Sequence, residues 1–298
     1  MKINRVSCIL ICGAISNPVS AASNWRVNAG VIADLSFNDN ITRVSSGTKL
    51  DEAITQINPY IGVSGKSKHI DLDLKYNMQN LFYSKSNQYD NTFHQFRGIT
   101  TAKLVRNFLF LDADATYAQQ NISNTTGTFF NNTTVTGNRT NVGTAKIKPY
   151  IKHNFGQSVQ LTAGAEYRVV RYGNSALLDS DISQYDFTLN SGKSFSRMMT
   201  WQLDYQKMKV TPETQSDIIF EQYNGSLGYK LTRKLTLTAT VGHEKNRFAR
   251  AAATSIPDGS KWTVGVKWTP TQRTAVDIGT GRRFFGTSGF LAVTTSSR

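Results

Sequence analysis

Residues 25–37 read WRVNAGVIADLSF, and apolar and polar side chains alternate along this stretch. Every second position from Trp25 to Phe37 is apolar, while the positions between them, such as Arg26, are polar or glycine, with Ile32 as the one break. Successive side chains of a β-strand point to opposite faces of the sheet. The period of two therefore predicts a strand whose two faces meet different environments.

The same unit recurs along the chain to about residue 295, with no convincing helical stretch. Many of the predicted strands reach or exceed the roughly 9–11 residues that a tilted strand needs to cross a bilayer. We predict an all-β fold, namely a transmembrane antiparallel up-and-down β-barrel of about 14 strands. The expected strands are 25–37, 53–65, 69–83, 93–105, 108–121, 142–154, 159–171, 183–191, 195–209, 216–231, 234–246, 259–269, 273–284 and 287–296.

A soluble antiparallel sheet also alternates, but its polar face is usually charged and its strands are shorter. Here the polar positions are rich in threonine, glutamine, asparagine and glycine, as in residues 235–241, LTLTATV. Aromatic residues collect near the strand ends, which is typical of the girdles at the two membrane interfaces. These aromatic residues are Trp25, Phe37, Phe82, Phe93, Phe96, Tyr117, Phe155, Tyr205, Tyr229, Trp268 and Phe284.

The connections between the predicted strands alternate in length. Short turns are expected near 65–68, 106–107, 155–158, 192–194, 232–233 and 270–272, and longer loops at 38–52, 84–92, 122–141, 172–182, 210–215 and 247–258. Bacterial barrels keep short turns in the periplasm and long loops outside the cell. The alternation therefore predicts that both termini are periplasmic, with the chain in the outer membrane.

The longest connection, 122–141, consists largely of asparagine, threonine, serine and glycine. This composition is typical of a flexible external loop. Phe129 and Phe130 offer an alternative, because the pair would either fold into the barrel mouth as a plug or lie on its rim.

Residues 1–22 have the pattern of a secretory signal peptide. Lys2 and Arg5 precede a short apolar stretch, and small residues at 19–22 offer cleavage sites. Residues 23–298 then form one outer-membrane β-barrel. Both cysteines, Cys8 and Cys12, lie in the signal, so the mature chain is expected to have neither a disulfide nor a thiolate site.

The chain is basic, with 34 lysine and arginine residues against 20 acidic ones and a formal net charge of +14. These charges form no lysine- or arginine-rich run, which argues against a nucleic-acid partner. Basic loops suit the phosphates of the outer leaflet instead. The expected partners are outer-membrane lipid and lipopolysaccharide, with exopolysaccharide or small solutes as possible cargo, and no oligomeric state is predicted.

Charged residues at the polar positions of the strands are the candidate lumen-lining residues. They are Asp71, Asp73, Arg97, Lys103, Asp112, Asp114, Lys146, Lys148, Lys152, Glu166, Arg168, Asp186, Lys267 and Arg283. Close carboxylates such as Asp71 with Asp73, or Asp112 with Asp114, are also compatible with acid–base work or calcium binding.

Cross-strand ion pairs explain these charges more simply. Aligning the strand ends places four pairs together, each contributing roughly 0.2–1 kcal/mol: Asp71 opposite Lys103, Asp114 near Lys148, Lys146 near Glu166, and Arg168 near Asp186. We interpret the charges as a structural ladder. The alternative is solute selectivity, in which unpaired cations would attract anions.

Catalytic chemistry finds little support in the sequence. The four histidines are scattered singly, without metal-ligand spacing. His153 and Asn154 lie near Ser158, but at a predicted periplasmic turn, the wrong end for lipase chemistry on the outer leaflet. We expect neither an enzyme nor a cofactor or metal.

Several stretches resemble one family. They are YNMQNLFY at 76–83, TFHQ at 92–95, FLFLDA at 108–113, AQQN at 118–121, WTPTQRT at 268–274 and GRRFFG at 281–286. Together they resemble the outer-membrane proteins associated with the PEP-CTERM/exosortase system, of the β-barrel porin type. The resemblance implies a barrel linked to exopolysaccharide loci, without a catalytic residue or transport substrate to carry over.

The resemblance also implies further hairpins after GRRFFG and a terminal aromatic residue, whereas this chain stops at Arg298. Either fourteen strands close atypically or the sequence is truncated at its C-terminus. The expected function is a porin-like barrel serving as a channel or accessory for exopolysaccharide export. The alternative is a structural or surface-interaction barrel without conductance.

Overall fold

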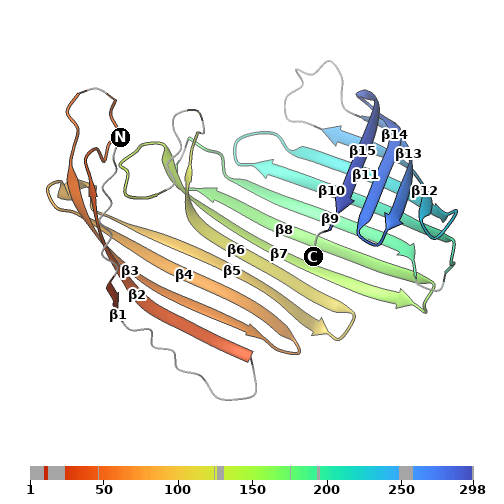
Figure 1. Ribbon diagram of the computed structural model, residues 1–298, viewed down its shortest axis with the longest axis horizontal. Helices are drawn as coiled ribbons and strands as arrows, with labels where there is room; N and C mark the ends of the chain where they lie inside the picture. The colour runs from red at the N-terminus through yellow and green to blue at the C-terminus, as the bar shows by residue number, and fades with distance from the viewer. Residues whose placement is uncertain are drawn as a thin grey trace. The chain divides into compact units, whose positions relative to one another are not determined.

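Fifteen β-strands and one short 3-10 helix make up the computed structural model, which describes residues 10–12, 24–45, 47–123, 125, 131–174, 176–192, 195–247 and 258–296. Each strand is hydrogen-bonded to its neighbour in chain order, from β1 to β15 (Figure 1). The elements are β1 (Leu10–Cys12), β2 (Asn24–Asn38), β3 (Glu52–Lys66), β4 (Ile70–Tyr83), η1 (Asn87–Tyr89), β5 (Asn91–Val105), β6 (Leu109–Asn121), β7 (Arg139–Phe155), β8 (Val159–Tyr172), β9 (Ser180–Ser191), β10 (Met199–Pro212), β11 (Ile218–Lys230), β12 (Leu235–Arg247), β13 (Asp258–Thr271), β14 (Thr274–Arg283) and β15 (Gly286–Thr295). Among these described residues, no helix is long and apolar enough to cross a membrane.

The all-β, antiparallel, up-and-down fold is confirmed, and the fourteen predicted strands correspond to β2–β15. These strands contain from 10 to 17 residues. The largest disagreement is at β10, which was predicted to begin at residue 195 and begins at Met199. The reason is local, because the Ser196 hydroxyl accepts hydrogen bonds from the backbone N–H groups of Met198 and Met199 and holds a turn there.

The strand that the sequence did not predict is β1. Its three residues pair antiparallel with Val31–Ala33 at the edge of β2, with Leu10 opposite Ala33. This strand lies within the segment predicted as a secretory signal. Cleavage of that signal stays a prediction, and it would leave the edge of β2 without this partner.

Short turns join every second pair of strands, as the sequence predicted. The turns between β5 and β6 and between β7 and β8 contain Asn107 and Gly156, whose φ angles are 57° and 61°. Asparagine and glycine are the residues that adopt this left-handed conformation most readily. Longer connections join the opposite ends of the strands, with two departures from this alternation. The hairpin between β14 and β15 is as tight as the short turns, and residues 192–198 between β9 and β10, predicted as a short turn at 192–194, form a longer connection than residues 213–217 between β10 and β11.

The chain divides into two compact units. Unit 1 comprises residues 1–102, 112–147 and 169–179, and unit 2 comprises residues 103–111, 148–168 and 180–298. Unit 1 contains a small buried cluster of Ile41, Ile54, Leu81 and Tyr83. In both units the sheet has one face of mainly polar side chains, called here the polar face, and one of mainly hydrophobic side chains, called the apolar face.

Hydrophobic side chains of the apolar face remain exposed. On β12, Leu237 and Val241 have exposed fractions of 40% and 64%, and on β13 Val264 reaches 46%. Burial usually stabilises such side chains by roughly 1.5–3 kcal/mol each, so a soluble protein would not leave a continuous row of them in water. The alternation seen in the sequence therefore separates a polar face from an apolar surface suited to lipid.

Candidate functional site

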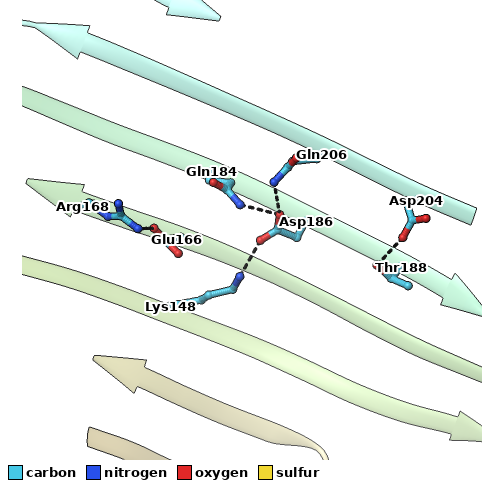
Figure 2. A network of polar contacts seen from close by, with 8 residues as sticks. All are labelled: Lys148, Glu166, Arg168, Gln184, Asp186, Thr188, Asp204 and Gln206. Carbon is cyan, nitrogen blue, oxygen red and sulfur yellow. Dashed lines mark hydrogen bonds and ion pairs between the residues drawn. The ribbon is translucent and has the colours of Figure 1, made fainter. Parts of the chain in front are cut away.

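A continuous chain of polar contacts crosses the polar face of unit 2. Lys148 Nζ lies 2.8 Å from Asp186 Oδ2, and Gln184 and Gln206 both donate hydrogen bonds to Asp186 Oδ1 (Figure 2). Gln206 in turn accepts a hydrogen bond of 2.7 Å from Gln222. The amides therefore connect charged groups on neighbouring strands into one network.

Glu244 is the hub at the other end of this network. Its carboxylate lies 2.8 Å from Lys261 Nζ and 2.7 Å from Arg283 Nη2, and Lys261 also donates to Gln222. The Glu244 side chain is only 7% exposed, whereas that of Arg283 is 47% exposed. A buried carboxylate is stable only when it is paired and hydrogen-bonded, and the two cations supply that pairing.

The polar face of unit 1 has a different chemistry, because carboxamides form its main network. Gln56 donates to Asp34 at 3.1 Å and accepts from Gln79 at 2.8 Å. Gln119 donates to Asn141 at 2.9 Å. An amide offers both donors and acceptors. This face can therefore form hydrogen bonds with uncharged polar groups as readily as it forms them with water.

Residues 131–136, called here the inner segment, lie on the polar face of unit 1. Asn132 donates hydrogen bonds to both Gln79 and Gln119. The Tyr83 hydroxyl donates to the Thr133 carbonyl at 2.9 Å, and the Val135 N–H donates to the Ile41 carbonyl at 3.0 Å. The predicted flexibility is therefore wrong for this part of 122–141, because its backbone groups are anchored, while the external position of the loop stays a prediction. Phe129 and Phe130, the predicted plug residues, lie outside the described residues.

Arg139 follows the inner segment in the chain and holds it in place by hydrogen bonds. Its guanidinium donates to the carbonyls of Asn131, Asn132 and Thr134, and it lies 5.9 Å from the ring centre of Phe93. Phe93 packs against the buried cluster of unit 1 and belongs to the polar-face side of β5. Its expected place in the aromatic girdle is therefore wrong, because the register pairs it with the inward-facing Gln79.

The structure brings most of the candidate lumen-lining residues together with partners. The observed contacts are Asp71 with Lys66 (3.4 Å), Asp73 with Lys75 (3.6 Å), Asp112 with the Thr101 hydroxyl (2.8 Å), Asp114 with Lys146, Lys148 with Asp186, Glu166 with Arg168 (2.6 Å), Arg283 with Glu244, and Lys152 over the rings of Tyr150 and Phe110 (5.3 and 5.6 Å). Of the other three, Arg97 is the Cα partner of Lys75, Lys267 is the Cα partner of Asp277, and Lys103 is exposed on β5.

The predicted pairing register is wrong. Asp71 lies opposite Thr101, not Lys103. Asp114 pairs with Lys146 instead of Lys148, and Arg168 pairs with Glu166 on its own strand. Aligning strand ends assumed strands without stagger, whereas the connections set the actual offset. A shift of two residues keeps every side chain on its face while it exchanges the ion-pair partners.

Sequence reasoning missed the residues that join the networks. Glu244 and Lys261 have the inward parity of their strands, and Lys261 continues the series that includes Lys267. The glutamines Gln56, Gln79 and Gln206 share this parity. Selecting every polar residue of that parity, rather than the charged ones alone, would have found them.

Loss of the Glu244 hub is expected to destabilise the fold. Glu244→Ala should lower the free energy of unfolding by about 2 kcal/mol, because it leaves Lys261 and Arg283 as partly buried cations without their shared carboxylate. Urea unfolding in lipid vesicles, followed by tryptophan fluorescence, measures the change. Asp71→Asn is the matched control, with an expected loss below about 1 kcal/mol, since the Lys66–Asp71 pair is exposed. Equal losses in the two variants would contradict the role of Glu244.

The strand order and the two contrasting faces define the class of protein: a transmembrane β-barrel of the outer-membrane type. In the described part of the chain, no group of three or more histidine, cysteine or acidic residues is arranged to hold a metal ion.

Comparisons with solved structures find outer-membrane proteins at low similarity. The ferric-catecholate import receptor Fiu from E. coli K12 is 9% identical, with a TM-score of 0.48 over 94% of this chain and 52% of the receptor. An OmpT variant from Vibrio cholerae is 12% identical, with a TM-score of 0.38 over 91% and 95% of the two chains. OccK2 from Pseudomonas aeruginosa, in complex with glucuronate, is 11% identical, with a TM-score of 0.33 over 91% and 93%.

This chain thus spans about half the length of the Fiu receptor. No protein-family model matches the chain, and no curated protein matches it. The class assignment rests on the strand order and the two faces rather than on these likenesses.

Proposed function

We propose that this protein is a porin-like outer-membrane barrel whose polar face forms a path for small polar solutes. The exposed apolar face is the observation that carries the proposal. Hydrophobic side chains such as Val241 and Val264 are stable at the surface only if lipid covers them. With lipid on that side, the network of ions and amides on the opposite face is left to meet water and solutes.

The polar face favours neutral or zwitterionic solutes over a dedicated anion route. Cations such as Lys148, Lys146 and Arg283 are each paired with a carboxylate. The two opposite charges of an ion pair cancel much of each other's electric field at the distance of a passing ion. The path therefore selects more by size and hydrogen bonding than by the sign of charge.

Planar-bilayer recording of the full chain tests the proposal. We expect discrete single-channel steps with weak preference between potassium and chloride. A strong anion preference would contradict the paired-charge account. No conductance from the full chain, together with none after the inner segment is replaced, would overturn the solute path itself.

A second candidate function is a barrel that does not conduct and acts at the surface. The observation that favours it is the inner segment, because Asn132 and Arg139 hold it over the polar face of unit 1. This candidate predicts no single-channel current through the full chain, and a current only after the inner segment is displaced. The same recordings therefore separate the two functions.

Outer-membrane lipid is the proposed environment of the apolar face. At the ends of β10–β12 near the longer connections, Lys207 and Lys245 lie on that face on either side of Glu221, and Lys209 on the same face is paired with Asp217 at 2.8 Å. Hydrogen bonds from Lys209 and Thr211 hold the pKa of the Asp217 carboxyl below its usual value. Cations just beyond the apolar band suit the phosphates of lipopolysaccharide, which supports the proposal that the longer connections face the outside and both termini the periplasm.

A role in exopolysaccharide export rests on the sequence resemblance to the PEP-CTERM/exosortase-associated barrels alone. Its test is genetic: deletion of the gene should reduce secreted polysaccharide, with restoration by the intact gene. Unchanged secretion would remove this part of the proposal and leave the solute path in place. The proposed function includes no catalytic step.

A further inference from the structure

A cavity of about 570 Å³ lies in unit 1, beside the inner segment. Its wall combines the ends of β4, β5 and β7 with three connections: residues 88–90, which are the last two residues of η1 and the one after it, the inner segment, and residues 173–174. This volume is in the range of small-ligand sites, roughly 300–1,000 Å³. The cavity is thus large enough for a solute of one or two rings.

Aromatic rings form part of the wall. Tyr83, Tyr89 and Phe93 all line the cavity, and the rings of Tyr83 and Tyr89 meet edge to face with centres 6.2 Å apart. The face of an aromatic ring carries partial negative charge and attracts the weakly positive C–H groups of a saturated ring. A ligand with an apolar face is therefore favoured.

The remaining wall is dense in carboxamides and hydroxyls. Side-chain amides come from Gln88, Asn91, Asn132, Asn141 and Asn174, and hydroxyls from Thr134, Thr136 and Thr140. An amide group has two N–H donors and a carbonyl acceptor, and a hydroxyl both donates and accepts. Such a lining matches a ligand that carries many hydroxyl groups, each of which also donates and accepts.

The charged groups at the cavity already have protein partners. Arg139 donates to the carbonyls of the inner segment, and the Asp90 carboxylate accepts the Tyr83 N–H at 2.7 Å. One cation and one carboxylate line the same space. This arrangement favours a neutral ligand over an anionic one.

We propose that this cavity binds a neutral saccharide of one or two rings, with a ring face against the aromatic wall and the hydroxyls on the amides. The proposal deepens the proposed function, on which it rests only for the passage of such a solute beyond the site. Binding itself is a separate property and can be measured without any current.

Titration calorimetry on the detergent-solubilised full chain tests the proposal, with maltose, sorbitol and glucuronate as probes. Maltose has sugar rings, sorbitol has hydroxyls without a ring, and glucuronate has a ring with a negative charge. We expect maltose to bind most tightly. Equal binding of sorbitol would contradict the role of the aromatic wall, and tighter binding of glucuronate would contradict a neutral ligand.

Variants locate the site. Tyr89→Ala should weaken maltose binding about tenfold, as expected for loss of one stacking ring, and Tyr89→Phe should retain it. Gln88→Ala, which changes an exposed side chain, should weaken binding without disturbing the fold. The matched control is Tyr60→Ala on β3, a tyrosine of the same unit that does not line the cavity. Unchanged binding in both Tyr89→Ala and Gln88→Ala would overturn the site.

The two proposals fail in distinguishable ways. Conductance without maltose binding would overturn the saccharide site and leave the solute path. Maltose binding without conductance, even after replacement of the inner segment, would overturn the path and leave the site.

Discussion

Replacement of residues 131–136 by alternating glycine and serine is expected to raise the single-channel conductance several-fold. The new segment keeps its length and its backbone carbonyls but loses the Asn132 amide that anchors it to Gln79 and Gln119. Its glycines also free the backbone, so that the carbonyl that accepts the Tyr83 hydroxyl is no longer fixed in position. The Arg139 guanidinium also loses carbonyls fixed in position for it. Without these contacts the segment no longer covers the polar face continuously, so the average cross-section for ions increases.

The matched control is the same replacement at residues 213–217, the connection between β10 and β11. This connection also joins strands at the end with longer loops, but its Asp217 contacts Lys209 and Thr211 on the adjoining strand β10. Its replacement should leave the conductance unchanged. Equal effects of the two replacements would contradict a specific role of the inner segment.

The second large effect is expected on the apolar face, at Val241→Arg. Val241 lies midway along β12, 64% exposed, between Gly225 and Trp262 on the neighbouring strands. An arginine facing lipid near the bilayer midplane destabilises a membrane barrel by about 2–4 kcal/mol. Folding into vesicles, followed by tryptophan fluorescence during urea titration, measures this loss.

Thr238→Arg is the matched control because Thr238 is an exposed residue of the same strand on the polar face. Its expected cost is below about 1 kcal/mol, since water reaches that face. Equal destabilisation by the two arginines would contradict the assignment of the faces. A milder effect at Val241 than at Thr238 would reverse it.

The sequence was sufficient to predict the strands because each one carries its own evidence. The alternation along residues 25–37 reflects only the fact that successive side chains meet different environments. The alternation along β12 has the same cause. The tight turns at Asn107 and Gly156 could also be predicted from the local sequence, because each contains a residue that readily adopts the left-handed conformation. Such features depend on neighbours in the chain and not on the offset between strands.

The site was harder to predict because it depends on that offset and on a loop. A two-residue shift of register between β4 and β5 left Asp71 on its face but placed Thr101 opposite it in place of Lys103, and the ion pair of Asp71 is with Lys66 on β3 instead. The inner segment is polar in composition, which suggested flexibility, yet its order comes from distant partners such as Ile41 and Gln79. Long-range backbone and amide contacts leave no periodic signal in the sequence.

Cysteine labelling along β12 tests the central claim most directly. Single variants Leu237→Cys, Thr238→Cys, Ala239→Cys, Thr240→Cys and Val241→Cys are prepared in a background without Cys8 and Cys12, folded into lipid vesicles and exposed to a water-soluble maleimide. Register and exposure place Thr238 and Thr240 on the polar face and the other three on the apolar face. We predict fast labelling at 238 and 240 and protection at 237, 239 and 241. Equal labelling at all five positions would contradict a polar solute path enclosed by a lipid-facing surface.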